Sequence, residues 1–136
     1  MNYLYEHKLR VRYAETDKMG YVYYGNYATY FEVARVEALR SLGLDYKSME
    51  DNGIMLPVLE YSIKFYKPAH YDDELVIKLT MNEITGSRIH FEFETFCNDV
   101  KLNVANVTLV FVNMHTNNAC KPPDYFIRKL QENKLK

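Results

Sequence analysis

AETDKMGYVYYGNYATYFEVARVEALRSLG, residues 14–43, is the stretch that decides the fold. It opens with turn-forming residues around Asp17 and Gly20, then continues as the only long amphipathic helix that the sequence predicts. Apolar residues recur there at helical spacing, at Tyr27, Phe31, Ala34, Ala38 and Leu42. Asn26 is a predicted N-cap and Gly43 a predicted left-handed C-cap. Small alanines on the apolar stripe indicate that this helix lies close against a curved sheet.

The rest of the chain reads mainly as β-strand. The predicted strands are residues 7–13, 58–66, 75–81, 89–94 and 104–112. The predicted short helices are residues 46–51, which Asp45 can cap, and 125–133. The run 104–112 is apolar on both faces, which predicts a central strand covered on each side. Short turns between the later strands favour antiparallel pairing. We therefore expect an α+β fold in which a curled antiparallel sheet wraps one long central helix.

A chain of 136 residues has the size of one domain, so residues 1–136 are predicted to form a single domain. One helix covers only part of such a sheet, and a second copy is the simplest cover for the remainder. We therefore expect a homo-oligomer, at least a dimer.

Composition excludes several classes of function. Lys plus Arg number 17 against 18 Asp plus Glu, so a formal charge of -1 gives no global basic field for nucleic acid. No apolar run approaches the ~20 residues that span a bilayer, so no stable membrane insertion is expected. The first residues lack the features of a signal peptide, and Cys97 and Cys120 form no disulfide framework. These observations predict a cytoplasmic protein.

Most catalytic templates are absent from the sequence. It contains no GxSxG, Walker or GxGxxG motif, and its four histidines show no ligand spacing. Cys97 has no basic neighbour in sequence that would activate it as a nucleophile. We therefore predict neither a metal site nor a cofactor.

Asp17 allows two interpretations. An aspartate in such a turn commonly just hydrogen-bonds its own backbone. Alternatively, the loop aims the carboxylate at free N–H groups near Tyr24 and Gly25, where the helix opening carries partial positive charge. Those N–H groups could polarise a carbonyl and hold its oxyanion. Asp17 would then attack that carbonyl or activate a water molecule.

A resemblance bears on this choice. The pattern Thr16-Asp17-x-x-Gly20-x-Val22-x-x-x-x-Tyr27, followed by Tyr30-x-Glu32-x-Ala34-Arg35-x-Glu37-x-Leu39-Arg40, resembles the signature of hotdog-fold acyl-CoA thioesterases. The most similar branch is the 4-hydroxybenzoyl-CoA thioesterase and YbgC-like group. The pattern covers about a quarter of the chain, and the strand order over the remainder agrees.

The resemblance implies specific site residues. Asp17 would be the catalytic carboxylate, and the backbone N–H of Tyr24 would polarise the thioester carbonyl. The family's site lies at a dimer interface, and its dimers often pair into tetramers. Gly25 is predicted to be a substrate-binding residue. Many members of the family carry a histidine at this position, so His-assisted chemistry is not expected here.

The three phosphates of coenzyme A require cations. Ser87 and Arg88 occupy the family-like position for contacts to the nucleotide end, and Lys64 and Lys67 are further candidates. A single exposed lysine is otherwise simply solvated. Glu32 and Arg35 are interpreted as an i,i+3 ion pair on the helix.

Three functions stay open at this stage. The first is an acyl-CoA thioesterase that releases a carboxylic acid and free coenzyme A, with Asp17 as nucleophile or general base. The second hydrolyses the same thioester on an acyl carrier protein, an acidic partner that requires a basic entrance. The third is a non-catalytic hotdog oligomer that binds acyl chains or scaffolds other proteins. The sequence does not identify the acyl group.

Overall fold

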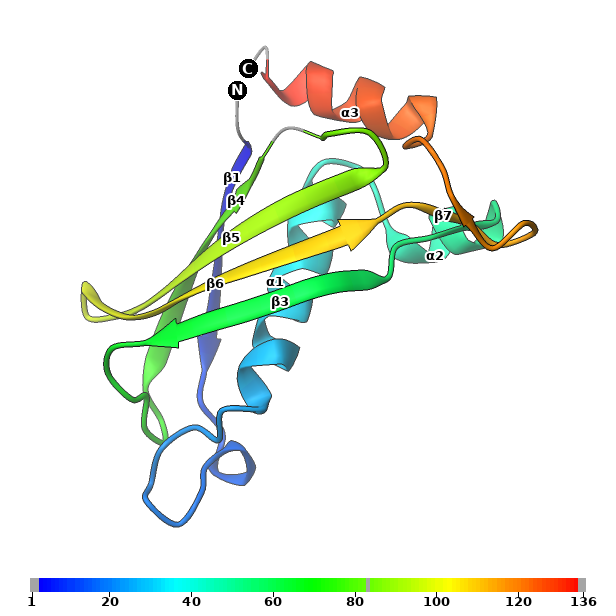
Figure 1. Cartoon of the computed structure of the whole chain (residues 1–136). Coiled ribbons are helices and arrows are strands. Elements are labelled where there is room, and N and C mark those ends of the chain that lie inside the picture. Colours follow the sequence, from blue (N-terminus) through cyan, green and yellow to red (C-terminus); the bar gives the residue numbers. More distant parts are fainter. Residues whose placement is uncertain (1–2, 83, 135–136) are drawn as a thin grey trace.

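The computed structural model describes residues 3–82 and 84–134. Its helices are α1 (Asn26–Ser41), α2 (Tyr46–Asp51) and α3 (Asp124–Lys134). Its longer strands are β1 (Tyr3–Arg10), β3 (Val58–Phe65), β4 (Glu74–Met81), β5 (Arg88–Cys97) and β6 (Val100–Val110). They form an antiparallel sheet in the order β1-β4-β5-β6-β3, which curls around α1 (Figure 1). The expected hotdog fold, a long helix within a curled antiparallel sheet, is confirmed.

The remaining elements are short. A second sheet joins β2 (Ile54–Met55), β7 (Val112–Asn113) and β8 (Asn118–Ala119). A single 3₁₀ turn, Tyr13–Glu15, follows β1. The predicted strand 7–13 was therefore wrong at both ends. Its C-terminal end fails because the Glu15 carboxylate accepts the backbone N–H of Arg12 at 2.8 Å, which turns the chain there.

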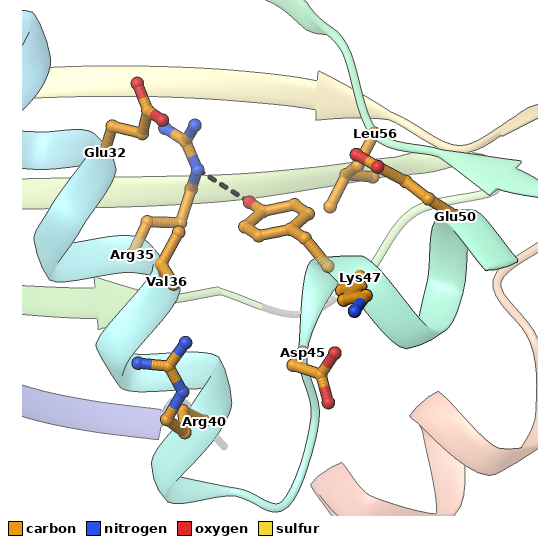
Figure 2. Close-up of a pocket in the computed structure, with 9 residues that line it drawn as sticks. Glu32, Arg35, Val36, Arg40, Asp45, Lys47, Glu50 and Leu56 are labelled. Atoms are coloured by element: carbon orange, nitrogen blue, oxygen red, sulfur yellow. Dashed lines mark hydrogen bonds between the residues drawn. The ribbon is translucent and has the colours of Figure 1, made fainter.

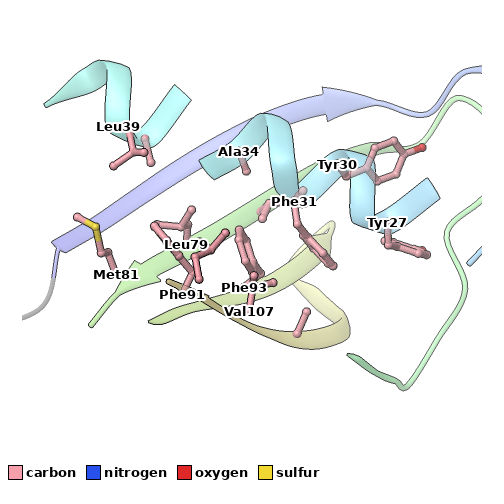
Figure 3. Close-up of a cluster of buried hydrophobic side chains, with 14 of the residues drawn as sticks. Tyr27, Tyr30, Phe31, Ala34, Leu39, Leu79, Met81, Phe91, Phe93 and Val107 are labelled. Carbon is pink, nitrogen blue, oxygen red and sulfur yellow. The ribbon is translucent and has the colours of Figure 1, made fainter. Parts of the chain in front are cut away.

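Helix α1 packs on the concave face of the sheet. Ala34 and Ala38 are fully buried, so their small side chains let the helix backbone approach the strands closely. Phe31 stacks on Phe93 of β5 with ring centroids 4.7 Å apart, at the centre of the core shown in Figure 3. These contacts fix both the rotation and the height of the helix over the sheet.

The end of α1 follows the predicted glycine signal. Gly43 adopts φ 84°, its N–H donates to the Arg40 carbonyl, and the Leu44 N–H donates to the Leu39 carbonyl. This pair of bonds is a Schellman motif. Asp45 then caps α2 by accepting the Ser48 N–H at 2.7 Å, as the sequence predicts.

Strand β6 differs from its prediction. Its inner residues Ala105, Val107 and Leu109 are buried, but its outer face is only half-buried. On that outer face the His90 ring hydrogen-bonds the side chains of Thr108 and Asn106, each at 3.1 Å. Within one chain the outer face is only partly covered, because the fold places its one long helix on the concave face, and the expected cover on that side stays a prediction.

Replacing Ala38 by leucine tests the close approach of α1. The larger side chain has no space against the sheet, so we expect the free energy of unfolding to fall by about 1–3 kcal/mol. The matched control is Val33→Leu, because Val33 lies on the same helix but is 43% exposed. Urea unfolding followed by circular dichroism measures both. Equal stability of the two variants would contradict this packing.

Candidate active site

The loop that carries Asp17 is held by backbone hydrogen bonds. The N–H of Asp17 donates to the Tyr21 carbonyl at 2.8 Å, and the N–H of Gly20 donates to the Asp17 carbonyl at 2.9 Å. Gly20 has φ 79°, a backbone conformation that glycine adopts without strain. The N–H of Val22 donates to the Ala69 carbonyl at 2.8 Å, which ties the loop to the segment before β4.

The two carboxylate oxygens of Asp17 have different surroundings. Oδ1 accepts the backbone N–H of Met19 at 2.9 Å and that of Tyr21 at 3.2 Å. Oδ2 accepts no hydrogen bond from the residues that the structure describes. The simple turn interpretation is thus correct for one oxygen, and it leaves the other oxygen of this half-buried side chain available to a ligand.

The opening of α1 differs from the predicted cap. Gly25 precedes the helix, and Asn26 is its first residue. The Asn26 side chain is no cap, because its Nδ2 donates to the Glu15 carbonyl at 2.8 Å. Within the described residues, the N–H groups of Tyr24 and Gly25 donate no hydrogen bond to the protein. The sequence predicts free N–H groups at this helix opening.

Asp17 and Tyr24 border the same cavity, whose volume is about 290 Å³. Apart from two charged residues, its walls are mainly aromatic and apolar. The lining residues are Asp17, Met19, Tyr21, Val22, Tyr24, Tyr27, Phe65, Tyr66, Lys67 and Pro68. The carboxylate, the helix opening and one candidate lysine therefore meet at one place.

Tyr27 forms part of the wall of this cavity. Its ring meets that of Phe65 edge to face with centroids 5.5 Å apart. Burial raises the pKa of Tyr27 to about 12, so its hydroxyl stays protonated at neutral pH. Tyr27 is thus a wall residue of the cavity.

The other candidate residues lie elsewhere. Lys64 is exposed on β3, with its Nζ 5.6 Å from the ring centroid of Tyr66, and it does not line the cavity. Ser87 and Arg88 stand at the start of β5, where Arg88 pairs with Val110. That end of the sheet is opposite the Asp17 loop (Figure 1). Within one chain, Ser87 and Arg88 therefore do not reach Asp17.

A larger cavity of about 590 Å³ lies between the second half of α1 and α2, away from Asp17 (Figure 2). Arg35 is 9% exposed there and donates from Nε to the Tyr46 hydroxyl at 2.8 Å. No ion pair joins Arg35 to Glu32 among the described residues, so that prediction was wrong. Tyr46 is the partner, and it reaches Arg35 only because α2 folds back against α1, which helical spacing does not reveal.

Two further findings bear on function. In residues 3–82 and 84–134, no three His, Cys, Asp or Glu side chains gather as a metal site would require. Over the same residues, no helix has the length and apolar character needed to cross a membrane.

Comparisons with known proteins identify the family. Residues 11–130 match the family model of the thioesterase-like superfamily. The chain is 32% identical over 107 residues to the acyl-CoA thioesterase YbgC of Haemophilus influenzae, covering 78% of this chain and 79% of YbgC. It is 35% identical over 89 residues to YneP of Bacillus subtilis, but this match spans only 64% of YneP and 65% of this chain.

A solved structure agrees with these sequence matches. The DHNA-CoA thioesterase of Staphylococcus aureus superposes with a TM-score of 0.86 and 30% identity, covering 98% of this chain and 95% of that one. The chain therefore belongs to the thioesterase-like superfamily, and these relatives support its assignment as a thioester hydrolase.

Proposed function

We propose that this chain hydrolyses acyl-CoA thioesters to a carboxylic acid and free coenzyme A, with Asp17 as the catalytic carboxylate. One observation carries the proposal. The Asp17 side chain and the helix opening at Tyr24 border a single cavity, and each offers a group that the protein leaves unused. A carboxylate oxygen and backbone N–H groups are the two parts that acyl transfer needs.

In the proposed reaction, the thioester carbonyl oxygen accepts the Tyr24 N–H. As negative charge develops on that oxygen, the N–H and the positive end of α1 stabilise it. In one route, Asp17 attacks the carbonyl carbon, the C–S bond breaks, and water hydrolyses the resulting anhydride. In the other route, Asp17 takes a proton from a water molecule while the oxygen of that water adds to the carbonyl carbon and the C–S bond then breaks. In both routes the thiolate leaves and is protonated.

The mouth of the cavity suggests how the rest of the substrate binds. Lys67 lines it and could meet a phosphate of coenzyme A, while exposed Lys64 stands three residues earlier. The same lysines would suit an acidic acyl carrier protein, and matched acyl-CoA and acyl-carrier substrates separate the two donors. The free cysteines Cys97 and Cys120 agree with the proposed cytoplasmic location.

We also propose that the enzyme is a homodimer or homotetramer. Strand β3 is an edge of the sheet, and it exposes large apolar side chains to an unusual extent. These are Val58 at 53%, Leu59 at 51%, Tyr61 at 39% and Phe65 at 46%. Phe65 also lines the Asp17 cavity, so a second copy paired along β3 would help to enclose it. Another subunit would then be the source of Ser87 and Arg88 for the coenzyme.

Asp17→Asn tests the catalytic assignment. The amide can still accept the turn N–H groups, but it neither attacks the thioester nor takes a proton from water. We expect kcat to fall by about 10²- to 10⁴-fold with an unchanged melting temperature. Release of free thiol from a panel of short, long and aromatic acyl-CoAs measures turnover. The matched control, Asp51→Asn on the exposed face of α2, should keep wild-type rates. A folded Asp17→Asn protein with normal turnover would exclude this function for Asp17.

Leu59→Lys tests the proposed interface. A charge on the exposed edge of β3 should oppose edge-to-edge pairing, so the variant should sediment as a monomer while the wild type sediments as an oligomer. Leu4→Lys is the control, because Leu4 is 72% exposed on β1, the other edge of the sheet. If Leu4→Lys dissociates the oligomer and Leu59→Lys does not, the interface lies on β1 and the proposal for β3 is wrong.

A further inference from the structure

Five polar residues behind the Asp17 loop join the two halves of the proposed site. We call them the Glu15 cluster: Arg12, Glu15, Tyr23, Asn26 and Tyr30. Glu15 ends the 3₁₀ turn two residues before Asp17, while Tyr23 and Asn26 flank the helix opening at Tyr24. Its hydrogen bonds therefore connect the segment that carries the carboxylate to the segment that carries the free N–H groups.

The Glu15 carboxylate binds both the loop and the helix. Oε1 accepts the backbone N–H of Arg12 at 2.8 Å and the hydroxyl of Tyr30, one turn into α1, also at 2.8 Å. Oε2 accepts Nε of Arg12 at 3.1 Å and its Nη2 at 2.9 Å. All four bonds go to donors on either side of Asp17 in the sequence.

The Glu15 backbone carbonyl makes the second connection. It accepts the backbone N–H of Tyr23 at 2.9 Å and Nδ2 of Asn26 at 2.8 Å. The backbone N–H of Tyr23, which precedes Tyr24, and the side chain of Asn26, which follows it, are thus bound to one carbonyl group. Movement of Glu15 would move Asp17 and the Tyr24 N–H relative to each other.

The cluster lies outside the cavity of the proposed reaction. Glu15, Arg12 and Tyr30 line a separate depression of about 180 Å³, and none of them lines the Asp17 cavity. Glu15 is therefore placed to act through its neighbours and not on a bound substrate.

Electrostatics favours an ionised Glu15 in this position. Burial is the largest single influence and opposes the charge, but the hydrogen bonds from Arg12 and Tyr30 together outweigh it and lower the pKa of the carboxyl. Burial and the bond to Glu15 raise the pKa of the Tyr30 hydroxyl, which stays protonated as a donor. The charge-assisted bond between them is stronger than one between neutral groups.

We propose that Glu15 is a positioning residue for the hydrolysis, which sets the Asp17 carboxylate against the N–H groups at the opening of α1. The inference rests on the proposed function for its effect on turnover. Its effect on the structure of the loop is independent of that function. The two are tested by different measurements.

Three variants remove different parts of the cluster. Glu15→Ala removes every carboxylate bond, so misplacement of Asp17 by about 1 Å should lower kcat by about 10²-fold with little change in KM. Tyr30→Phe removes one hydroxyl and should lower kcat by about tenfold. Glu15→Gln keeps the Oε1 acceptor for Tyr30 without its charge and loses the pair with an Arg12 side chain that is 80% exposed, so kcat should stay within about fivefold of wild type.

Glu37→Ala is the matched control, because it deletes another Glu–Arg pair three residues apart, with Arg40 on the far half of α1. It should leave kcat unchanged. A merely structural Glu15 would give variants whose kcat per folded molecule equals that of wild type, and this result would overturn the proposal. If Glu15→Ala fails to fold, the comparison of kcat between Tyr30→Phe and Glu37→Ala tests the proposal.

Amide hydrogen exchange separates this inference from the proposed function. The N–H groups of Met19 and Tyr21, which hold Asp17 Oδ1, should exchange at least about tenfold faster in Glu15→Ala or Tyr30→Phe than in wild type or Glu37→Ala. Unchanged exchange would refute positioning by Glu15. A wild-type protein that hydrolyses no thioester would instead refute the proposed function, and the exchange result would still decide the structural claim.

Discussion

The close packing of α1 on the concave face of the sheet is the constraint on which the rest of the structure depends. Ala34 and Ala38 are fully buried, so the helix backbone lies near the strands, and the stacked Phe31 and Phe93 rings fix its rotation. A helix held in this way has a fixed N-terminal end. Its first turn projects beyond the strands at the place where the loop from β1 arrives. The position of the Tyr24 N–H is therefore a consequence of core packing.

The loop between β1 and α1 supplies the second constraint, which is the pairing of its backbone groups. Around the helix opening, the N–H groups of Tyr23, Asn26 and Tyr27 all find carbonyl acceptors. Those of Tyr24 and Gly25 do not find one among the described residues. Both residues are exposed, so these donors are open to water or to a ligand oxygen. Asp17 also keeps one oxygen free of hydrogen bonds from the described residues, and Asp17 and Tyr24 border the same cavity.

Local patterns explain what the sequence predicts well. The apolar spacing from Tyr27 to Leu42, the glycine at 43 and the capping Asp45 are each read from neighbours within a few residues, and all three are confirmed. Two of the errors concern partners distant in sequence. The Asn26 side chain binds Glu15, 11 residues away, and Arg35 binds Tyr46, also 11 residues away, although both contacts were assigned to nearer partners. The hydrogen bonds that join Glu15 to Asn26 and Tyr30 also could not be predicted, because these residues are 11 and 15 positions away in the sequence.

A single chain leaves part of its apolar surface exposed. Strand β3 exposes apolar side chains at its free edge, and one of them, Phe65, also forms a wall of the Asp17 cavity. The same fold places Ser87 and Arg88 at the opposite end of the sheet from Asp17, and neither lines that cavity. The proposed oligomer would resolve both features, because a copy paired along β3 would bury the apolar edge and bring new side chains to the mouth of the cavity. In that proposal, association and substrate binding would both depend on the same exposed strand.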